Sequence, residues 1–149
     1  METLLIAVGN PLRRDDGAAR RVVELLGPLP PGVSAREVHQ LTPEIAEEIA
    51  GFDGAVFIDA AVCPSGGPAG KVRLTEIGDG IPAAPAPLAH YSTAEEILAL
   101  ARRLFGFTGR AWVCAVPGVD FSTGEGLSPL AESCARRAAQ ALRELLLTR

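Results

Sequence analysis

The chain has 149 residues, of which 48% are hydrophobic and 21% are charged, and its formal net charge at neutral pH is −4. This length suits one domain with a core of its own, so we expect a single domain over residues 1–149. The acidic balance argues against a nucleic-acid-binding surface and against a polybasic membrane anchor. Because no signal-peptide pattern and no apolar run of membrane-spanning length occurs, we expect a soluble, cytoplasmic protein, with a monomer as the default oligomeric state.

The chain contains three cysteines, Cys63, Cys114 and Cys134, which are widely separated. They form neither a Cys-x-x-Cys pair nor a Cys/His zinc pattern, so reduced thiols in a cytoplasm are the simplest interpretation. Cys63 stands four residues after Asp59, a residue that is considered below. We expect it to be an inert small hydrophobic residue or a loop thiol.

The N-terminal stretch predicts a strand, a loop and a helix in succession. An apolar run over residues 4–8 is followed by the turn-forming residues Gly9-Asn10-Pro11 and then by Asp15-Asp16-Gly17. Either aspartate could do no more than cap the helix, since a carboxylate there accepts a free backbone N–H. A cap needs only one carboxylate, however, and the loop is longer than a cap requires. The acidic pair is therefore a candidate functional site.

The rest of the chain alternates between strand-like and helix-like hydrophobic patterns. The predicted strands cover residues 4–8, 33–38, 55–58, 71–77 and 110–116, and the predicted helices begin near residues 17, 43, 93 and 129. We expect a surface loop over residues 78–88, which are rich in Pro, Gly and Ala. Alternating strands and helices predict an α/β fold, namely a doubly wound, mostly parallel five-stranded sheet flanked by helices on both faces.

Several helix and strand ends carry recognisable signals. Thr42-Pro43 and Ser128-Pro129 are typical of helix starts, and Gly27 is typical of a helix end. The segment Ser92-Thr93-Ala94-Glu95 predicts a capping box in front of the third helix. The continuous apolar run 55–58 predicts a strand buried on both faces that ends at Asp59, whereas the alternation over 71–77 favours an edge strand.

Three polar side chains follow predicted strands at the edge where an open parallel sheet binds ligands. Asp16 follows the first strand, Asp59 ends the third, and His90 stands between the 71–77 strand and the next helix. Two carboxylates brought together repel each other unless a proton or a cation lies between them. With an imidazole added, the donor set suits a borderline ion such as Ni²⁺ or Zn²⁺.

Each of these residues also has a plainer interpretation. Asp59 could cap a turn, and His90 could be an ordinary surface histidine. His39, which follows the second strand, could approach the same edge, but no motif supports it.

Gly9-Asn10, Leu12 and Asp15-Asp16-Gly17 resemble the opening motif of the hydrogenase maturation proteases. These endopeptidases trim the C-terminus of the nickel–iron hydrogenase large subunit after nickel has been inserted. Asp59-Ala60, the segment His90-Tyr91-Ser92-Thr93 and the helix start Gly126-Leu127-Ser128-Pro129 are similar to further motifs of the family.

The resemblance implies that Asp16, Asp59 and His90 are the nickel-contacting and catalytic residues. The nickel would be borne by the substrate, a hydrogenase large-subunit precursor, and no nucleotide would be needed. As general base, Asp15 or Asp16 is the best candidate. Two features depart from the family pattern: Ala7 replaces the first glycine, and the segment 39–43 (His-Gln-Leu-Thr-Pro) replaces a glycine-rich loop.

Three other functions remain open at this point. A protein of the same fold could be a non-proteolytic metal-binding accessory protein or a small-molecule hydrolase. A receiver-type signalling domain also has an acidic pair after its first strand and an aspartate at the end of its third. In a receiver domain, however, the acidic pair follows the strand at once and a lysine precedes the proline that ends the fifth strand, whereas this chain has Ala115-Val116-Pro117 there.

Overall fold

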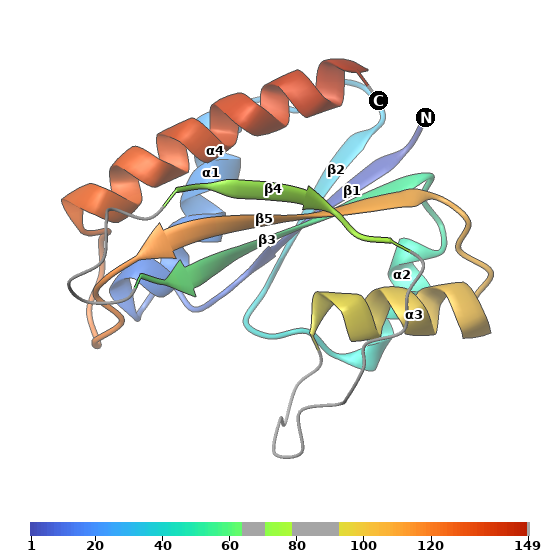
Figure 1. The fold of residues 1–149 in the computed structure, drawn as a ribbon, viewed down its shortest axis with the longest axis horizontal. Helices are drawn as coiled ribbons and strands as arrows, with labels where there is room; N and C mark the ends of the chain where they lie inside the picture. Colours follow the sequence, from blue (N-terminus) through green and yellow to red (C-terminus); the bar gives the residue numbers. More distant parts are fainter. Residues whose placement is uncertain (64–70, 79–92, 149) are drawn as a thin grey trace.

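The computed structural model describes residues 1–63, 71–78 and 93–148, and its central element is a five-stranded sheet with the strand order β2-β1-β3-β5-β4 (Figure 1). All neighbouring strands are parallel except the edge strand β4, which is antiparallel to β5. The predicted doubly wound, mostly parallel sheet is therefore confirmed. The strands are β1 (Thr3–Val8), β2 (Val33–Val38), β3 (Gly54–Val62), β4 (Arg73–Glu76) and β5 (Arg110–Gly118).

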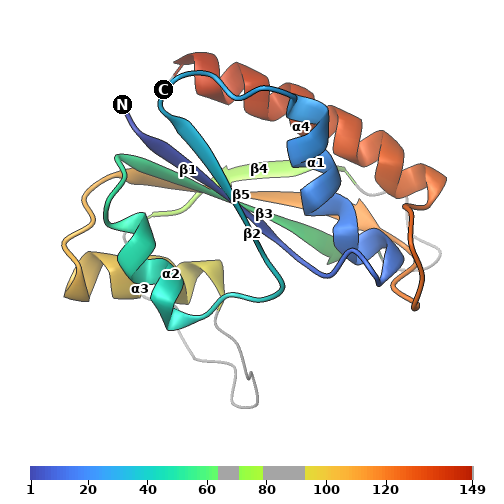
Figure 2. The ribbon, with the colours of Figure 1, turned by 180° about the vertical axis from the view of Figure 1, so that it is seen from behind.

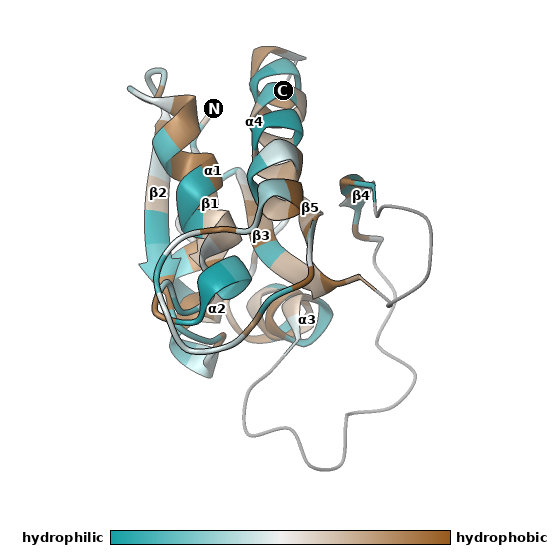
Figure 3. Cartoon of the chain, turned by 90° about the vertical axis from the view of Figure 1, so that its left-hand side faces the viewer, coloured by the Kyte–Doolittle hydropathy of each residue, from teal (hydrophilic) through white to brown (hydrophobic). Residues whose placement is uncertain are grey.

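Helices cover both faces of the sheet, as the alternating sequence pattern predicts (Figures 2 and 3). One face packs against α1 (Ala18–Leu26) and α4 (Pro129–Thr148), and the other packs against α2 (Pro43–Ile49) and α3 (Ala94–Leu104). Each face has its own apolar core, because successive side chains of a strand point to opposite sides. A short 3₁₀ helix, η1 (Arg14–Gly17), joins the loop after β1 to α1.

The two central strands are longer than the sequence predicts. The strand expected to end at Asp59 continues to Val62, because β5 pairs with it from Gly54↔Arg110 to Val62↔Gly118. β1 stops earlier, and its last residue, Val8, lies opposite Asp59. Asp59 is thus an internal residue of β3 that stands where the pairing with β1 ends.

The predicted helix starts are close to the observed ones. Thr42 and Ser128 precede α2 and α4 as expected. The residue that caps α3 is Thr93, whose side-chain oxygen accepts a hydrogen bond of 3.2 Å from the backbone N–H of Glu96. The predicted pair Ser92 and Glu95 is therefore wrong by one residue, and Ser92 itself lies outside the described residues.

The observed bounds of two other elements differ slightly from the predicted ones. Gly17 closes η1 and is not part of α1. The edge strand covers Arg73–Glu76, which is shorter than the predicted 71–77. Of the predicted loop 78–88, only Gly78 lies within the described residues.

Candidate functional site

Asp16 and Asp59 line the same hollow, which lies at the carboxyl ends of β1 and β3 and has a volume of about 700 Å³. β1 lies between β2 and β3, so the chain passes from β1 to β2 on one side and then crosses to β3 on the other. This is the place where open parallel sheets bind ligands. The hollow has an apolar floor that includes Phe57 and a polar wall that includes Asn10, Arg13, His39 and Glu95. The sequence-based prediction that the two aspartates come together is confirmed.

The turn after β1 holds Asp16 against its own backbone. The backbone N–H of Asn10 donates a hydrogen bond of 2.8 Å to Oδ2 of Asp16. Gly9, with φ of +142°, lies so close to Asp16 that a Cβ at this position would stand 2.0 Å from the Asp16 carbonyl oxygen. Only glycine tolerates both the conformation and the approach. The Gly9-Asn10 motif therefore serves to position the Asp16 carboxylate.

The Asp59 carboxyl lies in a position that disfavours its negative charge. The side chain still meets solvent in the hollow. The protein around the carboxyl nevertheless displaces part of its hydration, and this desolvation raises the pKa of Asp59 to about 6. The negative charge of Asp16 raises it further. A cation placed between the two carboxylates would stabilise the negative charge of Asp59 in place of the lost hydration and would offset the repulsion by Asp16.

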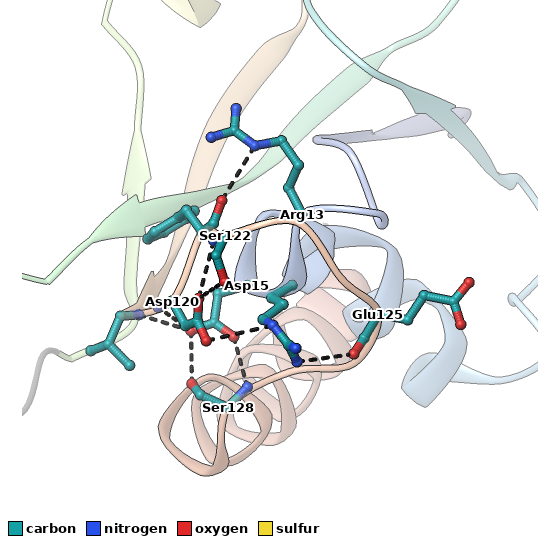
Figure 4. Close-up of polar contacts among 9 residues, drawn as sticks. Arg13, Asp15, Asp120, Ser122, Glu125 and Ser128 are labelled. Atoms are coloured by element: carbon teal, nitrogen blue, oxygen red, sulfur yellow. Dashed lines mark hydrogen bonds and ion pairs between the residues drawn. The ribbon is translucent and has the colours of Figure 1, made fainter.

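Asp15, in contrast, is completely buried and serves as a structural anchor (Figure 4). Its carboxylate accepts hydrogen bonds from the backbone N–H groups of Val119 (2.8 Å), Asp120 (3.0 Å) and Ser128 (2.7 Å). The Ser128 hydroxyl donates a fourth hydrogen bond of 2.7 Å. Burial alone would raise the pKa of Asp15, but these hydrogen bonds, of which the one from the Ser128 backbone N–H has the largest effect, bring the pKa below its usual value. Of the two candidates for a general base, Asp16 is the one that faces the hollow.

Neither Asp15 nor Asp16 caps η1 or α1. The residues that precede η1 and α1 are Arg13 and Gly17, and neither makes a side-chain capping hydrogen bond. Asp15 instead holds Ser128, whose hydroxyl oxygen accepts a hydrogen bond of 3.2 Å from the backbone N–H of Ala131 in the first turn of α4. The capping interpretation is thus wrong for α1, and the acidic pair has two separate roles.

Arg14 strengthens the same connection between the loop after β1 and the loop after β5. Its backbone N–H donates to the Gly124 carbonyl at 3.0 Å, and its guanidinium lies 3.6 Å from the Asp120 carboxylate. Arg14 also has a positive φ of 45°, which is unusual for a residue with a side chain. Sequence reasoning missed this connection, and only the neighbouring Arg13-Arg14-Asp15 charges hinted at it.

The two histidines considered as site residues, His90 and His39, differ in what the structure describes of them. His90 lies outside the described residues. His39 lines the hollow although no sequence motif pointed to it. Within residues 1–63, 71–78 and 93–148, no group of three or more His, Cys, Asp or Glu side chains is arranged to hold a metal ion. Of the three predicted site residues, the described part of the chain places two, Asp16 and Asp59, in this hollow, and Glu95 contributes a further carboxylate to its wall. None of the helices in the described part of the chain is long and apolar enough to cross a membrane.

Several solved structures that share this fold are described as hydrogenase maturation proteases. The hydrogenase maturating endopeptidase HybD from E. coli superimposes with a TM-score of 0.73 at 23% identity, over 97% of this chain and 93% of that one. The hydrogenase 2 maturation peptidase from a Thaumarchaeota archaeon gives 0.69 at 22% identity, over 98% of both chains. The [NiFe] hydrogenase maturation protease HycI from Thermococcus kodakarensis gives 0.67 at 23% identity, over 97% and 92%.

Comparisons of the sequence alone add nothing to this likeness. No protein-family model matches the chain, and no curated protein sequence matches it significantly. The similarity thus lies in the arrangement of the elements over almost the whole chain. It establishes the fold and leaves the activity to be argued from the site.

Proposed function

We propose that this protein is an endopeptidase that removes the C-terminal extension of a hydrogenase large-subunit precursor. The precursor carries bound nickel, and the nickel is the feature that the protein recognises. Processing of this kind takes place in the cytoplasm. The residues that contact the nickel are Asp16, Asp59 and His90.

The observation that carries this proposal is the placement of Asp16 and Asp59 in one hollow on the fold of the maturation endopeptidases. The sequence motifs around both residues resemble those of the same family. Fold likeness alone would be a weak argument, because one fold hosts many functions. Here the fold, the sequence motifs and the shared position of Asp16 and Asp59 in one hollow all support the same function.

The site residues have separate tasks in this function. Asp16 and Asp59 provide carboxylate oxygens to the nickel of the precursor, whose charge relieves the repulsion between them. His90, which enters from the sequence resemblance, adds a nitrogen ligand. Binding the loaded precursor at this point fixes the peptide bond to be cut beside Asp16, which can orient an attacking water.

The direct test is a cleavage assay on the nickel-loaded precursor, with the metal-free precursor beside it. We expect trimming of the loaded form only. Asp16→Asn, Asp59→Asn and His90→Ala should each lower the rate by about a hundredfold or more, since misplacing the bound substrate is that costly.

Asp53→Asn is the matched control, because Asp53 immediately precedes β3, at the opposite end of the strand from the hollow. Its carboxylate accepts a hydrogen bond from the backbone of Glu2, and the amide oxygen of asparagine can do the same. This variant should process the precursor normally. Equal trimming of both precursor forms would rule out nickel as the recognition element, and trimming of neither would overturn the proposal as a whole.

A further inference from the structure

Arg13 and Arg14 are adjacent in the chain but differ in what they contact. The Arg14 guanidinium is engaged with two groups of the loop after β5: the Asp120 carboxylate and, at 3.3 Å, the Glu125 carbonyl oxygen. Arg13 makes one side-chain hydrogen bond, from Nε to the Phe121 carbonyl oxygen at 3.3 Å. In the described part of the chain, no carboxylate lies within ion-pair distance of Arg13.

The backbone around Arg13 is firmly held. Its N–H donates to the Asn10 carbonyl and its own carbonyl accepts from the Asp16 N–H, both at 3.0 Å. Arg13 also forms a parallel β-bridge with Gly124. Figure 4 shows that its guanidinium points away from the cluster around Asp15 and Ser128. The Nε contact fixes the base of the guanidinium and leaves its two terminal nitrogens for another group.

Arg13 lines the hollow that holds Asp16 and Asp59. The other ionised wall groups there are carboxylates, those of Asp16, Asp59 and Glu95, so a guanidinium supplies the one strong cation among the described wall residues. A guanidinium presents a planar pair of donors that matches the two oxygens of a carboxylate. Arg14 is paired, whereas Arg13 has no ion-pair partner among the described residues although it lines the same hollow as Asp16 and Asp59, and this leaves its guanidinium available to a ligand.

We propose that Arg13 binds a carboxylate of the peptide that is being processed and so helps to select it. This inference rests on the proposed endopeptidase function and names one chemical group that the substrate must carry near the cut bond. The group is either an acidic side chain or the terminal carboxylate of the extension. The chemistry of recognition is the same in both cases, a guanidinium fork on a carboxylate.

The kinetic test compares Arg13→Gln and Arg13→Lys with the unchanged protein on the nickel-loaded precursor. For Arg13→Gln we expect KM to rise about ten- to a hundredfold, as the loss of a charge-assisted hydrogen-bonded pair does, with kcat nearly unchanged. Arg13→Lys should recover part of the loss, because lysine keeps the charge but not the fork. The free energy of unfolding of both variants should match that of the unchanged protein.

Arg103→Gln serves as the matched control, since Arg103 is an exposed arginine in α3 and loses the same charge outside the lining of the hollow. Its KM should not change. An unchanged KM for Arg13→Gln, or an equal rise for Arg103→Gln, would overturn the inference while leaving the endopeptidase function intact.

A binding experiment separates the two sources of the carboxylate and does not depend on cleavage. The probes are three alanine pentapeptides: one capped at both ends, one capped with a central glutamate, and one with a free C-terminal carboxylate. We expect the NMR signal of the Arg13 Nε–H group to move with the second or the third peptide and to stay in place with the first. The peptide that moves it identifies the source.

The two proposals can fail separately in this experiment. A carboxylate-dependent shift in a protein that trims no precursor would support the Arg13 site and reject the endopeptidase function. A shift with all three peptides, with none of them, or one whose accompanying backbone shifts persist in Arg13→Gln would reject the Arg13 site.

Discussion

The Asp15 carboxylate and Ser128 are joined by two hydrogen bonds of 2.7 Å, one from the backbone N–H and one from the hydroxyl of Ser128. The two residues are 113 positions apart in the sequence. Their connection fixes the start of α4 against the loop that follows β1. It also turns Asp15 inward, so that its neighbour Asp16 is the aspartate that lines the hollow.

Replacing this anchor should destabilise the whole domain. Asp15→Asn keeps one acceptor oxygen but places an NH₂ group against buried N–H and O–H donors that lose their partner. We expect the free energy of unfolding, measured with urea, to fall by about 3 kcal/mol. Asp53→Asn, which removes an exposed carboxylate, should change it by less than about 0.5 kcal/mol. Equal values for the two variants would contradict the anchoring role.

Gly9 should be intolerant of even the smallest side chain. In Gly9→Ala the new Cβ meets the Asp16 carbonyl oxygen, so the turn must open and the Asp16 carboxylate must move. We expect a loss of roughly 2 kcal/mol or more in the free energy of unfolding together with loss of precursor processing. Gly51→Ala is the control, since the nearest atom to its added Cβ is 3.5 Å away. Normal processing by Gly9→Ala would show that the turn does not position Asp16.

The raised pKa of Asp59 should appear in the pH dependence of stability. Its pKa is about 6 in the folded protein and near the ordinary 3.8 in the unfolded chain, so the folded state holds more protons between these values. The contribution of Asp59 to stability therefore falls as the pH rises from about 4 to about 6. At pH 7 the ionised carboxylate destabilises the fold.

Asp59→Asn, which cannot ionise, should consequently be more stable than the unchanged protein at pH 7, and the difference should disappear near pH 3. Urea unfolding at a series of pH values measures this directly. Asp53→Asn should show no such pH-dependent gain. If the Asp59→Asn curve runs parallel to that of the unchanged protein, the carboxyl is not destabilised in the way described.

The three cysteines should differ sharply in reactivity. Cys114 and Cys134 are fully buried, and burial raises the pKa of both thiols, that of Cys114 to about 12. Cys63 is half-buried and immediately follows β3. Because the thiolate is the reactive form, a thiol reagent should modify only Cys63 in the folded protein and all three cysteines after denaturation. Rapid modification of more than one cysteine in the folded state would contradict this arrangement.

The sequence predicted the fold well because its information is local and periodic. Strand-like and helix-like patterns alternate along the chain, and that alternation alone leads to a doubly wound sheet. It also places Asp16 and Asp59 at the same edge, since β1 and β3 are neighbours in this arrangement. The turn around Asp16 was signalled by Gly9 and Asn10, whose conformational preferences are well known.

The features that the sequence did not predict are of two kinds. Some depend on residues far away in the chain, and others depend on a choice between neighbouring residues that fit the same sequence pattern equally well. Asp15 and Asp16 are alike in sequence, and their roles separate only when Ser128 arrives from far along the chain. β3 and β5 exceed their apolar runs because each extends the other by pairing. Ser92 with Glu95 and Thr93 with Glu96 satisfy the same capping pattern, so no sequence rule chooses between them.

The link between Asp15 and Ser128 also means that the loop after β1 cannot reach its final form until Ser128 has been synthesised. Residues leave the ribosome in order, and N-terminal parts begin to fold first. Until Ser128 emerges, the Asp15 carboxylate lacks two of its four hydrogen bonds, and α4 is not there to cover α1. Asp16 and Asp59 are translated before Ser128, so the loop that positions Asp16 gains its last hydrogen bonds only after the ribosome has passed Ser128.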